Sequence, residues 1–165
     1  MLFPASFFKK KYIRKVIYFF DVIHGYFISS LIFFFIFMIV SSLAQPLLWE
    51  KSWYGWLFFS TINGLACHQY EPRCLHLFEF TTGICARCFA FYLSSVLAYF
   101  ACIIVSKYRH ISISQKLFFL MILPLVIDGS TQALIDRESS NMLRVVTGIL
   151  AGTAISIRIF SFNRK

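Results

Sequence analysis

Residues 67–92 organise this chain, and they read CHQYEPRCLHLFEFTTGICARCFAFY. The stretch holds four of the five cysteines and two of the four histidines of a protein built otherwise mainly from Phe, Ile and Leu. Polar groups near hydrocarbon cost several kcal/mol unless a partner satisfies them. We therefore expect these cysteines and histidines to form a functional site, and not part of a lipid-facing surface.

The composition outside this stretch predicts the class of protein. The 165-residue chain is 59% hydrophobic and 19% aromatic, and its mean hydropathy is positive. A soluble core of this length cannot bury so much apolar surface. We predict an all-α integral membrane bundle, with one membrane domain over residues 1–165.

Four apolar runs are long enough to cross a bilayer, which takes about 20 residues. They cover about residues 26–48, 85–105, 117–135 and 142–160. Residues 6–20 are basic and aromatic, a pattern typical of an interfacial helix. Residues 54–66 are apolar but too short to span, so we expect a re-entrant or an interfacial helix there.

The basic residues predict the orientation of the four spans. An even number of spans places both termini and the loop after residue 105 on one side. That side collects 11 of the 16 basic residues: Lys9, Lys10, Lys11, Arg14, Lys15, Lys107, Arg109, Lys116, Arg158, Arg164 and Lys165. The positive-inside rule makes this side cytoplasmic, which leaves the Cys/His cluster at the extracytoplasmic edge.

The formal net charge of +9 does not indicate nucleic acid as a partner. Lys and Arg gather at the ends of the apolar runs, where they meet anionic lipid headgroups. We therefore expect the lipid bilayer as the partner, and no nucleic acid. The sequence leaves the oligomeric state open.

Cys85 and Cys88 lie three residues apart at the start of the second span, so a helical first turn points both thiols the same way. A helix N-terminus also favours the thiolate form. With an upstream Cys-His arm, the pair provides the four soft ligands that tetrahedral zinc prefers; iron is the second choice. The ligands that we expect are Cys67, His68, Cys85 and Cys88, with Cys74 and His76 as alternatives to His68 in the fourth position.

Three other interpretations of the cysteines stay open. Cys85 and Cys88 could be a redox dithiol that exchanges disulfides with Cys67 or Cys74, as in a quinone-linked thiol oxidoreductase. The cysteines could form a structural disulfide in an outer loop. The protein could also be a non-enzymatic scaffold or a small transporter with structural zinc.

A second polar group lies at the outer ends of the last two spans. Asp128 and Gln132 are four residues apart on one helix face, with the carboxylate on the order of 10 Å below the outer end. An acid at that depth should have a partner or be protonated, and Arg144 or Arg87 could pair with it. A purely structural pair that sets the helix register is an equal alternative.

We expect these residues to wall a pocket beside the metal site. If the site is catalytic, Arg144 positions an anion and Asp128 acts as acid or base. The substrate that suits this location is lipid-linked or anionic. The candidate catalytic residues are Asp128, Arg144, Gln132, Asn141 and Arg87.

At these motifs the chain resembles a family of small prokaryotic membrane proteins, domain of unknown function 2085. The family pattern is Cys-His-Gln-x-Pro-x-Arg-Ser, then Pro-Val-Cys-Ala-Arg-Cys-Thr-Gly-x-Tyr, then Asp-Gly-x-x-Gln, then Asn-x-x-Arg-x-x-Thr-Gly. The matching residues are Cys67-His68-Gln69, Cys85-Ala86-Arg87-Cys88, Tyr92, Asp128-Gly129, Gln132, Asn141, Arg144 and Thr147-Gly148. The resemblance covers about residues 60–152 and implies a prokaryotic cytoplasmic membrane, the topology and the site.

The chain departs from that family pattern at a few positions. Cys74 stands near the family's Ser, Gly83-Ile84 replaces Pro-Val, and Phe89-Ala90 replaces Thr-Gly. The last change argues against a role for the family's Thr hydroxyl in this chain. The resemblance implies no reaction.

Overall fold

The computed structural model describes residues 5–49, 51–77, 80–109, 111–135 and 137–162, leaving aside the side chains of residues 5–22, 24, 77, 80 and 162. Within these ranges the chain is mainly helical, with one small antiparallel hairpin, so the predicted all-α class is confirmed. The elements are α1 (Ala5–Leu48), α2 (Trp53–Ala66), η1 (Glu71–Arg73), β1 (Cys74–Leu77), β2 (Phe80–Cys85), α3 (Ala86–Val105), α4 (Gln115–Ile135) and α5 (Asn141–Phe162).

Four helices of the described chain are long and apolar enough to cross a membrane. Their spans are Gly25–Leu48, Ala86–Val105, Gln115–Ile135 and Asn141–Ser161. These bounds lie within two residues of the predicted ones. The prediction of four spans is therefore confirmed.

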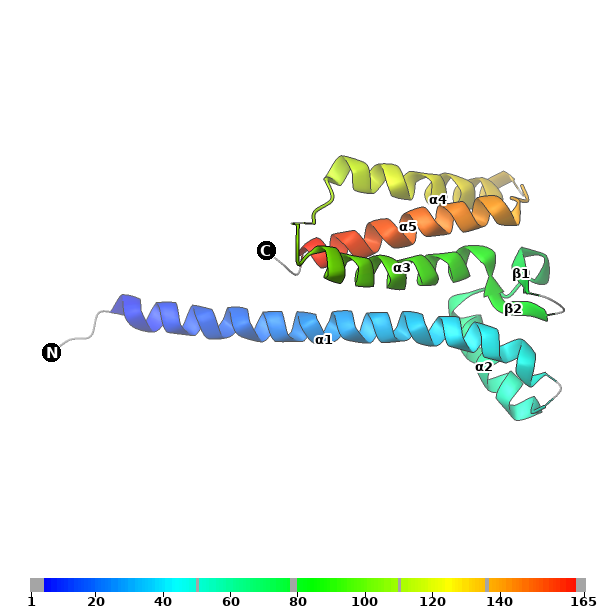
Figure 1. Ribbon diagram of the computed structural model, residues 1–165, viewed down its shortest axis with the longest axis horizontal. Coiled ribbons are helices and arrows are strands. Elements are labelled where there is room, and N and C mark those ends of the chain that lie inside the picture. Colours follow the sequence, from blue (N-terminus) through cyan, green and yellow to red (C-terminus); the bar gives the residue numbers. More distant parts are fainter. Residues whose placement is uncertain (1–4, 50, 78–79, 110, 136, 163–165) are drawn as a thin grey trace.

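Residues 6–20 are helical but do not form a separate element. They continue the first span without a break, so α1 is a single helix of 44 residues. Figure 1 shows α1 projecting past the ends of the other helices. The predicted break between an interfacial helix at residues 6–20 and the first span is absent. The segment between them has no proline, and its one glycine, Gly25, costs only about 1 kcal/mol in a helix.

The helices pack side by side, and the hairpin closes one end of them. α3 contacts α1 and α5, and α5 also contacts α4. Figure 1 shows α2 and the hairpin at one end, and the start of α1, the end of α3 and the end of α5 at the other. This arrangement agrees with an even number of spans. The cytoplasmic location of the second end stays a prediction from the charge pattern.

Two glycines let α5 lie directly on α3. A Cβ atom at Gly148 would lie 2.5 Å from the backbone oxygen of Arg87, and one at Gly152 would lie 2.8 Å from the hydroxyl of Ser95. No side chain fits at such distances, so this Gly-x-x-x-Gly pair allows the close packing of the two helices. The contact at Gly148 brings the second turn of α5 beside the first turn of α3.

The expected short helix at residues 54–66 is α2, which turns back at the end of α1 (Figure 1). Ser52 caps its N-terminus by accepting a hydrogen bond from the backbone of Gly55. The fully buried Asn63 ties α2 to α1, because it accepts a hydrogen bond from Ser41 at 2.7 Å and donates one to Gln45 at 2.8 Å. This fixed helix delivers Cys67 to the site.

Candidate metal centre

Three cysteine sulfur atoms meet where α2, β2 and α3 come together. The Sγ atoms of Cys67, Cys85 and Cys88 all lie within 4.8 Å of one another. Three sulfur ligands at about 2.3 Å around one tetrahedral zinc ion lie about 3.8 Å apart. The cluster is therefore within a small side-chain adjustment of a three-thiolate metal site.

The loop after α2 folds back so that Cys67 faces the start of α3. At the turn, Gln69 has a left-handed backbone conformation, with φ at 52°. Residues other than glycine rarely adopt this conformation. Its amide group is held by two hydrogen bonds with Ser60, which anchor the turn to α2. The backbone N–H of Cys85 then donates a hydrogen bond to the Cys67 sulfur at 3.2 Å.

The hairpin sets the position of the other two thiols. β1 pairs with β2 in antiparallel register, with Cys74 opposite Cys85 and His76 opposite Thr81. Cys85 is the last residue of β2 and also the N-cap of α3. Cys88 follows in the first helical turn, so both sulfurs face Cys67 as the three-residue spacing predicts.

Apolar side chains from three elements pack around the thiols. Phe35 and Met38 of α1, Ile84 of β2 and Tyr92 of α3 form one buried cluster with Cys67. Such a setting keeps bulk water from one side of the sulfur atoms. Charged ligands and a metal ion interact more strongly there than in water.

The close approach of the three thiols shifts their pKa values. Hydrogen bonds from the Cys85 and Cys88 thiols lower the pKa of Cys67 well below that of a free thiol. The pKa of Cys85 is raised, chiefly because its proton is held in the hydrogen bond to Cys67. The cluster thus favours a negative charge on one sulfur, which is the form that binds metal.

The candidates for a fourth ligand lie outside the sulfur cluster. Cys74 is buried, its thiol donates a hydrogen bond to the Tyr70 carbonyl at 3.4 Å, and burial raises its pKa to about 12. His76 is exposed on β1. His68 is also exposed but lines the same cavity as the three cysteines. The described residues therefore bring together three of the four predicted ligands.

A cavity of about 170 Å³ opens beside the cysteines. Three arginines and one glutamine reach it from four different elements, and no carboxylate lies among its described lining residues. These four side chains are Arg73 of η1, Arg87 of α3, Gln132 of α4 and Arg144 of α5. We call this space the arginine pocket.

Asp128 lies next to this pocket and pairs with Arg87, one of the two predicted partners. Its carboxylate also accepts a hydrogen bond from Ser139 and contacts Arg137 at 3.4 Å. Asp128 is only 4% exposed, so the buried charge is compensated from three directions. The carboxylate therefore holds Arg87 in place.

Arg144 is 3% exposed and makes a different contact from the predicted ion pair with Asp128. Its Nη1 atom donates to the Asn141 side chain at 2.8 Å. The Asn141 amide in turn donates to the carbonyls of Pro72 and Cys74, at 3.3 and 3.2 Å. Asn141 thus ties Arg144 to the loop before the hairpin.

Five buried donor nitrogens of the pocket have no acceptor within the described residues. The buried, unpartnered nitrogens are Arg73 Nε, Arg87 Nε, Gln132 Nε2, Arg144 Nε and Arg144 Nη2. All five belong to residues that line the arginine pocket. Buried donors without acceptors are rare in native proteins, so they point to a missing partner.

Sequence reasoning missed Arg73, Arg137 and Ser139. Arg73 lies in η1 and pairs at 3.3 Å with the exposed Glu138. The family pattern carries an arginine just before the position of Cys74, which could have identified Arg73. Arg137 and Ser139 lie in the connection between α4 and α5, where no periodic pattern marks a buried contact.

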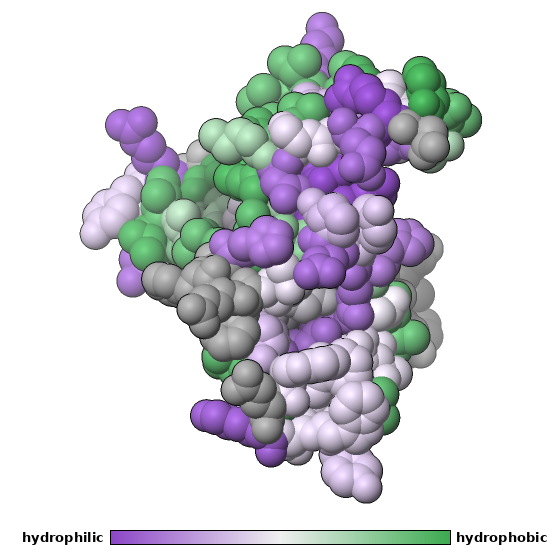
Figure 2. Space-filling view, turned by 90° about the vertical axis from the view of Figure 1, so that its right-hand side faces the viewer, coloured by the Kyte–Doolittle hydropathy of each residue, from purple (hydrophilic) through white to green (hydrophobic). Residues whose placement is uncertain are grey.

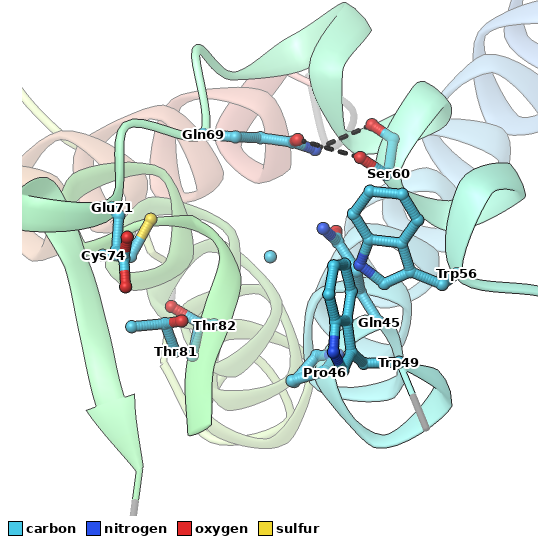
Figure 3. A pocket seen from close by; sticks show the side chains of 11 residues that line it. Gln45, Pro46, Trp49, Trp56, Ser60, Gln69, Glu71, Cys74, Thr81 and Thr82 are labelled. Atoms are coloured by element: carbon cyan, nitrogen blue, oxygen red, sulfur yellow. Dashed lines mark hydrogen bonds between the residues drawn. The ribbon is translucent and has the colours of Figure 1, made fainter. Parts of the chain in front are cut away.

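A second, larger cavity of about 510 Å³ lies on the other side of the loop that follows Cys67. Figure 3 shows Trp49 and Trp56 on one wall, Glu71 and Cys74 on the opposite wall, and Gln69 held by Ser60. The described lining of this tryptophan cavity carries one carboxylate and no cation. The charge of its described lining is therefore opposite in sign to that of the arginine pocket.

The two cavities lie at the same end of the bundle. Figure 2 shows this end of the molecule, with hydrophilic residues gathered in a band across it and hydrophobic residues to the sides. A site at this end is reached from water and also from the level of lipid headgroups.

The residues present fit a zinc ion. Soft thiolates are the ligands that select zinc or iron, and three of them leave one tetrahedral position for another group. The hydrogen bond from the Cys85 backbone orients the Cys67 sulfur, as contacts around metal ligands commonly do. The cysteines and the arginine pocket share a boundary, so a ligand in the pocket could also reach a metal ion.

Comparison with other proteins gives relatives from archaea. An uncharacterised protein of Methanocaldococcus jannaschii is 32% identical over 105 residues, which cover 61% of this chain and 67% of the relative. An uncharacterised protein of Methanothermobacter thermautotrophicus is 31% identical over 91 residues, 55% of this chain and 81% of the relative. No solved structure matches the chain significantly.

Residues 67–158 match the sequence profile of a family described as predicted membrane proteins. The match begins at the first site cysteine and ends within α5, so it contains the three thiols and the residues of the arginine pocket from Cys67 onward. The predicted resemblance is confirmed: the chain belongs to the membrane proteins of domain of unknown function 2085.

Proposed function

We propose that the protein is a membrane metalloenzyme whose Cys67, Cys85 and Cys88 bind one zinc ion beside the arginine pocket. The observation that carries this proposal is the approach of three sulfur atoms to within 4.8 Å of one another. Iron is the alternative metal, because it also prefers thiolate ligands. The substrate would be a lipid-linked or anionic molecule.

The fourth metal position would face the arginine pocket. Among the predicted candidates, His68 lines the same cavity as the thiols, yet it is exposed and its ring lies outside the sulfur cluster. An open position distinguishes catalytic zinc from structural zinc. Zinc held in this way supplies Lewis-acid chemistry, because it polarises an oxygen atom of a substrate or of water.

The residues of the chain would bind and orient the substrate. Arg144 and Arg87 would bind an anionic group in the pocket, and Gln132 would donate a further hydrogen bond. Asp128 would act as a positioning residue through its ion pair with Arg87. Asn141 would do the same for Arg144 through the hydrogen bond at 2.8 Å.

The proposed location is the extracytoplasmic edge of the cytoplasmic membrane. The charge pattern of the sequence supports this orientation through the positive-inside rule. A site there meets lipid headgroups and extracytoplasmic solutes. Both fit an anionic or lipid-linked substrate.

Elemental mass spectrometry of the detergent-purified protein, combined with a count of free thiols, tests the proposal. We expect about one zinc ion per chain, as for a stoichiometric thiolate site. The thiols of Cys67, Cys85 and Cys88 should resist alkylation until a chelator removes the metal. A metal-free protein with disulfide-linked cysteines would contradict the proposal.

One observation favours a second candidate, a quinone-linked thiol oxidoreductase. Cys74 is the cross-strand partner of Cys85 in the hairpin, and such pairs have backbone separations that a disulfide can bridge. Cys74 is buried, however, and its thiol is bound to the Tyr70 carbonyl. A disulfide between Cys74 and Cys85 in the purified protein would support this second function.

A further inference from the structure

The arginine pocket carries more hydrogen-bond donors than the described chain can satisfy. Five buried nitrogen atoms on four side chains lack an acceptor. Guanidinium groups have no acceptor atom, and the amide nitrogen of Gln132 is also a donor only. The missing partner must therefore be rich in acceptors.

The charge of the pocket indicates that this partner is an anion. Arg73, Arg87 and Arg144 line the pocket, and none of the described lining residues is a carboxylate. Asp128 and Glu138 offset part of the charge from outside, through Arg87 and Arg73. Arg144 has no described carboxylate partner within 4.0 Å although it is 97% buried, and a buried unpaired charge is costly.

The number and origin of the donors favour a tetrahedral anion. They come from η1, α3, α4 and α5, so they approach from several sides of the cavity. Three or four oxygen atoms of a phosphoryl group can accept from so many donors, whereas a carboxylate offers only two oxygens in one plane. Arginine is also the side chain best suited to bind phosphate through paired N–H groups.

The size of the cavity agrees with one phosphoryl group. Its volume of about 170 Å³ is below the range of about 300–1,000 Å³ that is typical for drug-sized ligands. A phosphate monoester would place its charged end here and leave the rest of the molecule outside. The larger tryptophan cavity lacks cations and is not a candidate for this group.

We infer that the arginine pocket is a binding site for the phosphoryl group of a phosphate monoester or of free phosphate. The inference deepens the proposed function and rests on it for the role of the metal, but the donors belong to the chain alone. Arg144 is the central contact, with two free donor atoms. Arg73, Arg87 and Gln132 complete the site.

Isothermal titration of the zinc-loaded protein with inorganic phosphate, at constant ionic strength, tests the inference. We expect saturable binding that Arg144→Gln weakens by about 10- to 100-fold, because hydrogen bonds to charged groups carry that much affinity. Arg109→Gln, on an exposed residue beyond the end of α3, is the matched control and should leave phosphate binding unchanged. Arg73→Gln is a second test of the same site, for the case that Arg144→Gln does not fold. Arg73 is less buried, so its substitution should disturb folding less.

Two sources of the phosphoryl group are separated by competition. In nanodiscs that contain phosphatidic acid, displacement of inorganic phosphate identifies a lipid headgroup as the better ligand. Unchanged phosphate binding in those nanodiscs identifies a soluble phosphate compound. Equal affinity for malonate and phosphate would overturn the phosphoryl assignment, because malonate carries only carboxylates.

Metal analysis of the same samples keeps this inference apart from the proposed function. Absence of phosphate and phosphatidic acid binding by a zinc-loaded protein, or equal binding by the Arg144→Gln variant, would overturn the phosphoryl site alone. Phosphate binding by a protein that holds no metal would support the phosphoryl site and contradict the metal centre.

Discussion

Replacing Cys88 by alanine is expected to remove the metal from the purified protein. The Cys88 sulfur is one of only three within the described cluster, so its loss leaves two protein ligands. Changes to groups that merely support a metal ligand weaken binding by about 10- to 100-fold, and loss of a ligand should cost at least as much. A competition titration with a chromogenic chelator measures the change.

Cys102→Ala is the matched control for this substitution. Cys102 lies on the same helix and is buried, whereas Cys88 is partly exposed, and Cys102 is outside the sulfur cluster. The control should keep stoichiometric metal, and both variants should keep the helical circular dichroism spectrum. Retention of tight metal binding by Cys88→Ala would show that the three thiols are not the ligands.

Asp128→Asn is expected to destabilise the protein strongly. The carboxylate is 4% exposed and compensates Arg87 and Arg137 while it accepts a hydrogen bond from Ser139. Breaking a buried ion pair by removing one partner costs about 3–5 kcal/mol, because the remaining charge loses its compensation. Thermal unfolding in detergent should show a correspondingly lower Tm.

Glu138→Gln tests whether this effect depends on burial. Glu138 pairs with Arg73 at 3.3 Å, and the two side chains are 62% and 34% exposed. An exposed pair of this kind contributes about 0–1 kcal/mol, so the Tm should change little. Equal effects of the two substitutions would mean that the Asp128 network does not stabilise the bundle.

The transmembrane helices were predictable because their signal is local. Each span shows itself as a run of about 20 apolar residues, and the observed bounds differ from the predicted ones by two residues at most. The continuity of α1 could not be read in the same way. A basic amphipathic pattern is compatible with a surface helix and with the extension of a span, and helix propagation across residues 20–26 decides between them.

The three thiols were also predictable, because Cys85 and Cys88 have helical spacing and Cys67 heads a Cys-His arm. The depth of Asp128 in its span predicted an arginine partner, either Arg87 or Arg144, and the structure shows Arg87. The choice between them depends on how far α3 and α5 slide past each other. Gly148 sets that contact against the backbone of Arg87, which no spacing rule reveals.

Three side chains around Asp128 and the arginine pocket lie at the limit of prediction from sequence. Arg73, Arg137 and Ser139 belong to short connections, and their partners lie between 2 and 65 residues away in the chain. Loops carry no helical or strand period from which a facing side can be deduced. The fourth metal position could not be predicted for the same reason, because His68 lies on a loop whose path depends on the left-handed turn at Gln69, and the same loop leads to Cys74 at the start of β1.

X-ray absorption spectroscopy at the zinc edge of the purified protein tests the three-thiolate site with an open position most directly. We predict three sulfur neighbours at about 2.3 Å and one oxygen neighbour at about 2.0 Å. The same spectrum is expected for the His68→Ala variant, because the exposed His68 ring lies outside the sulfur cluster. Four sulfur neighbours would contradict the open position, since they would mean that Cys74 closes the site.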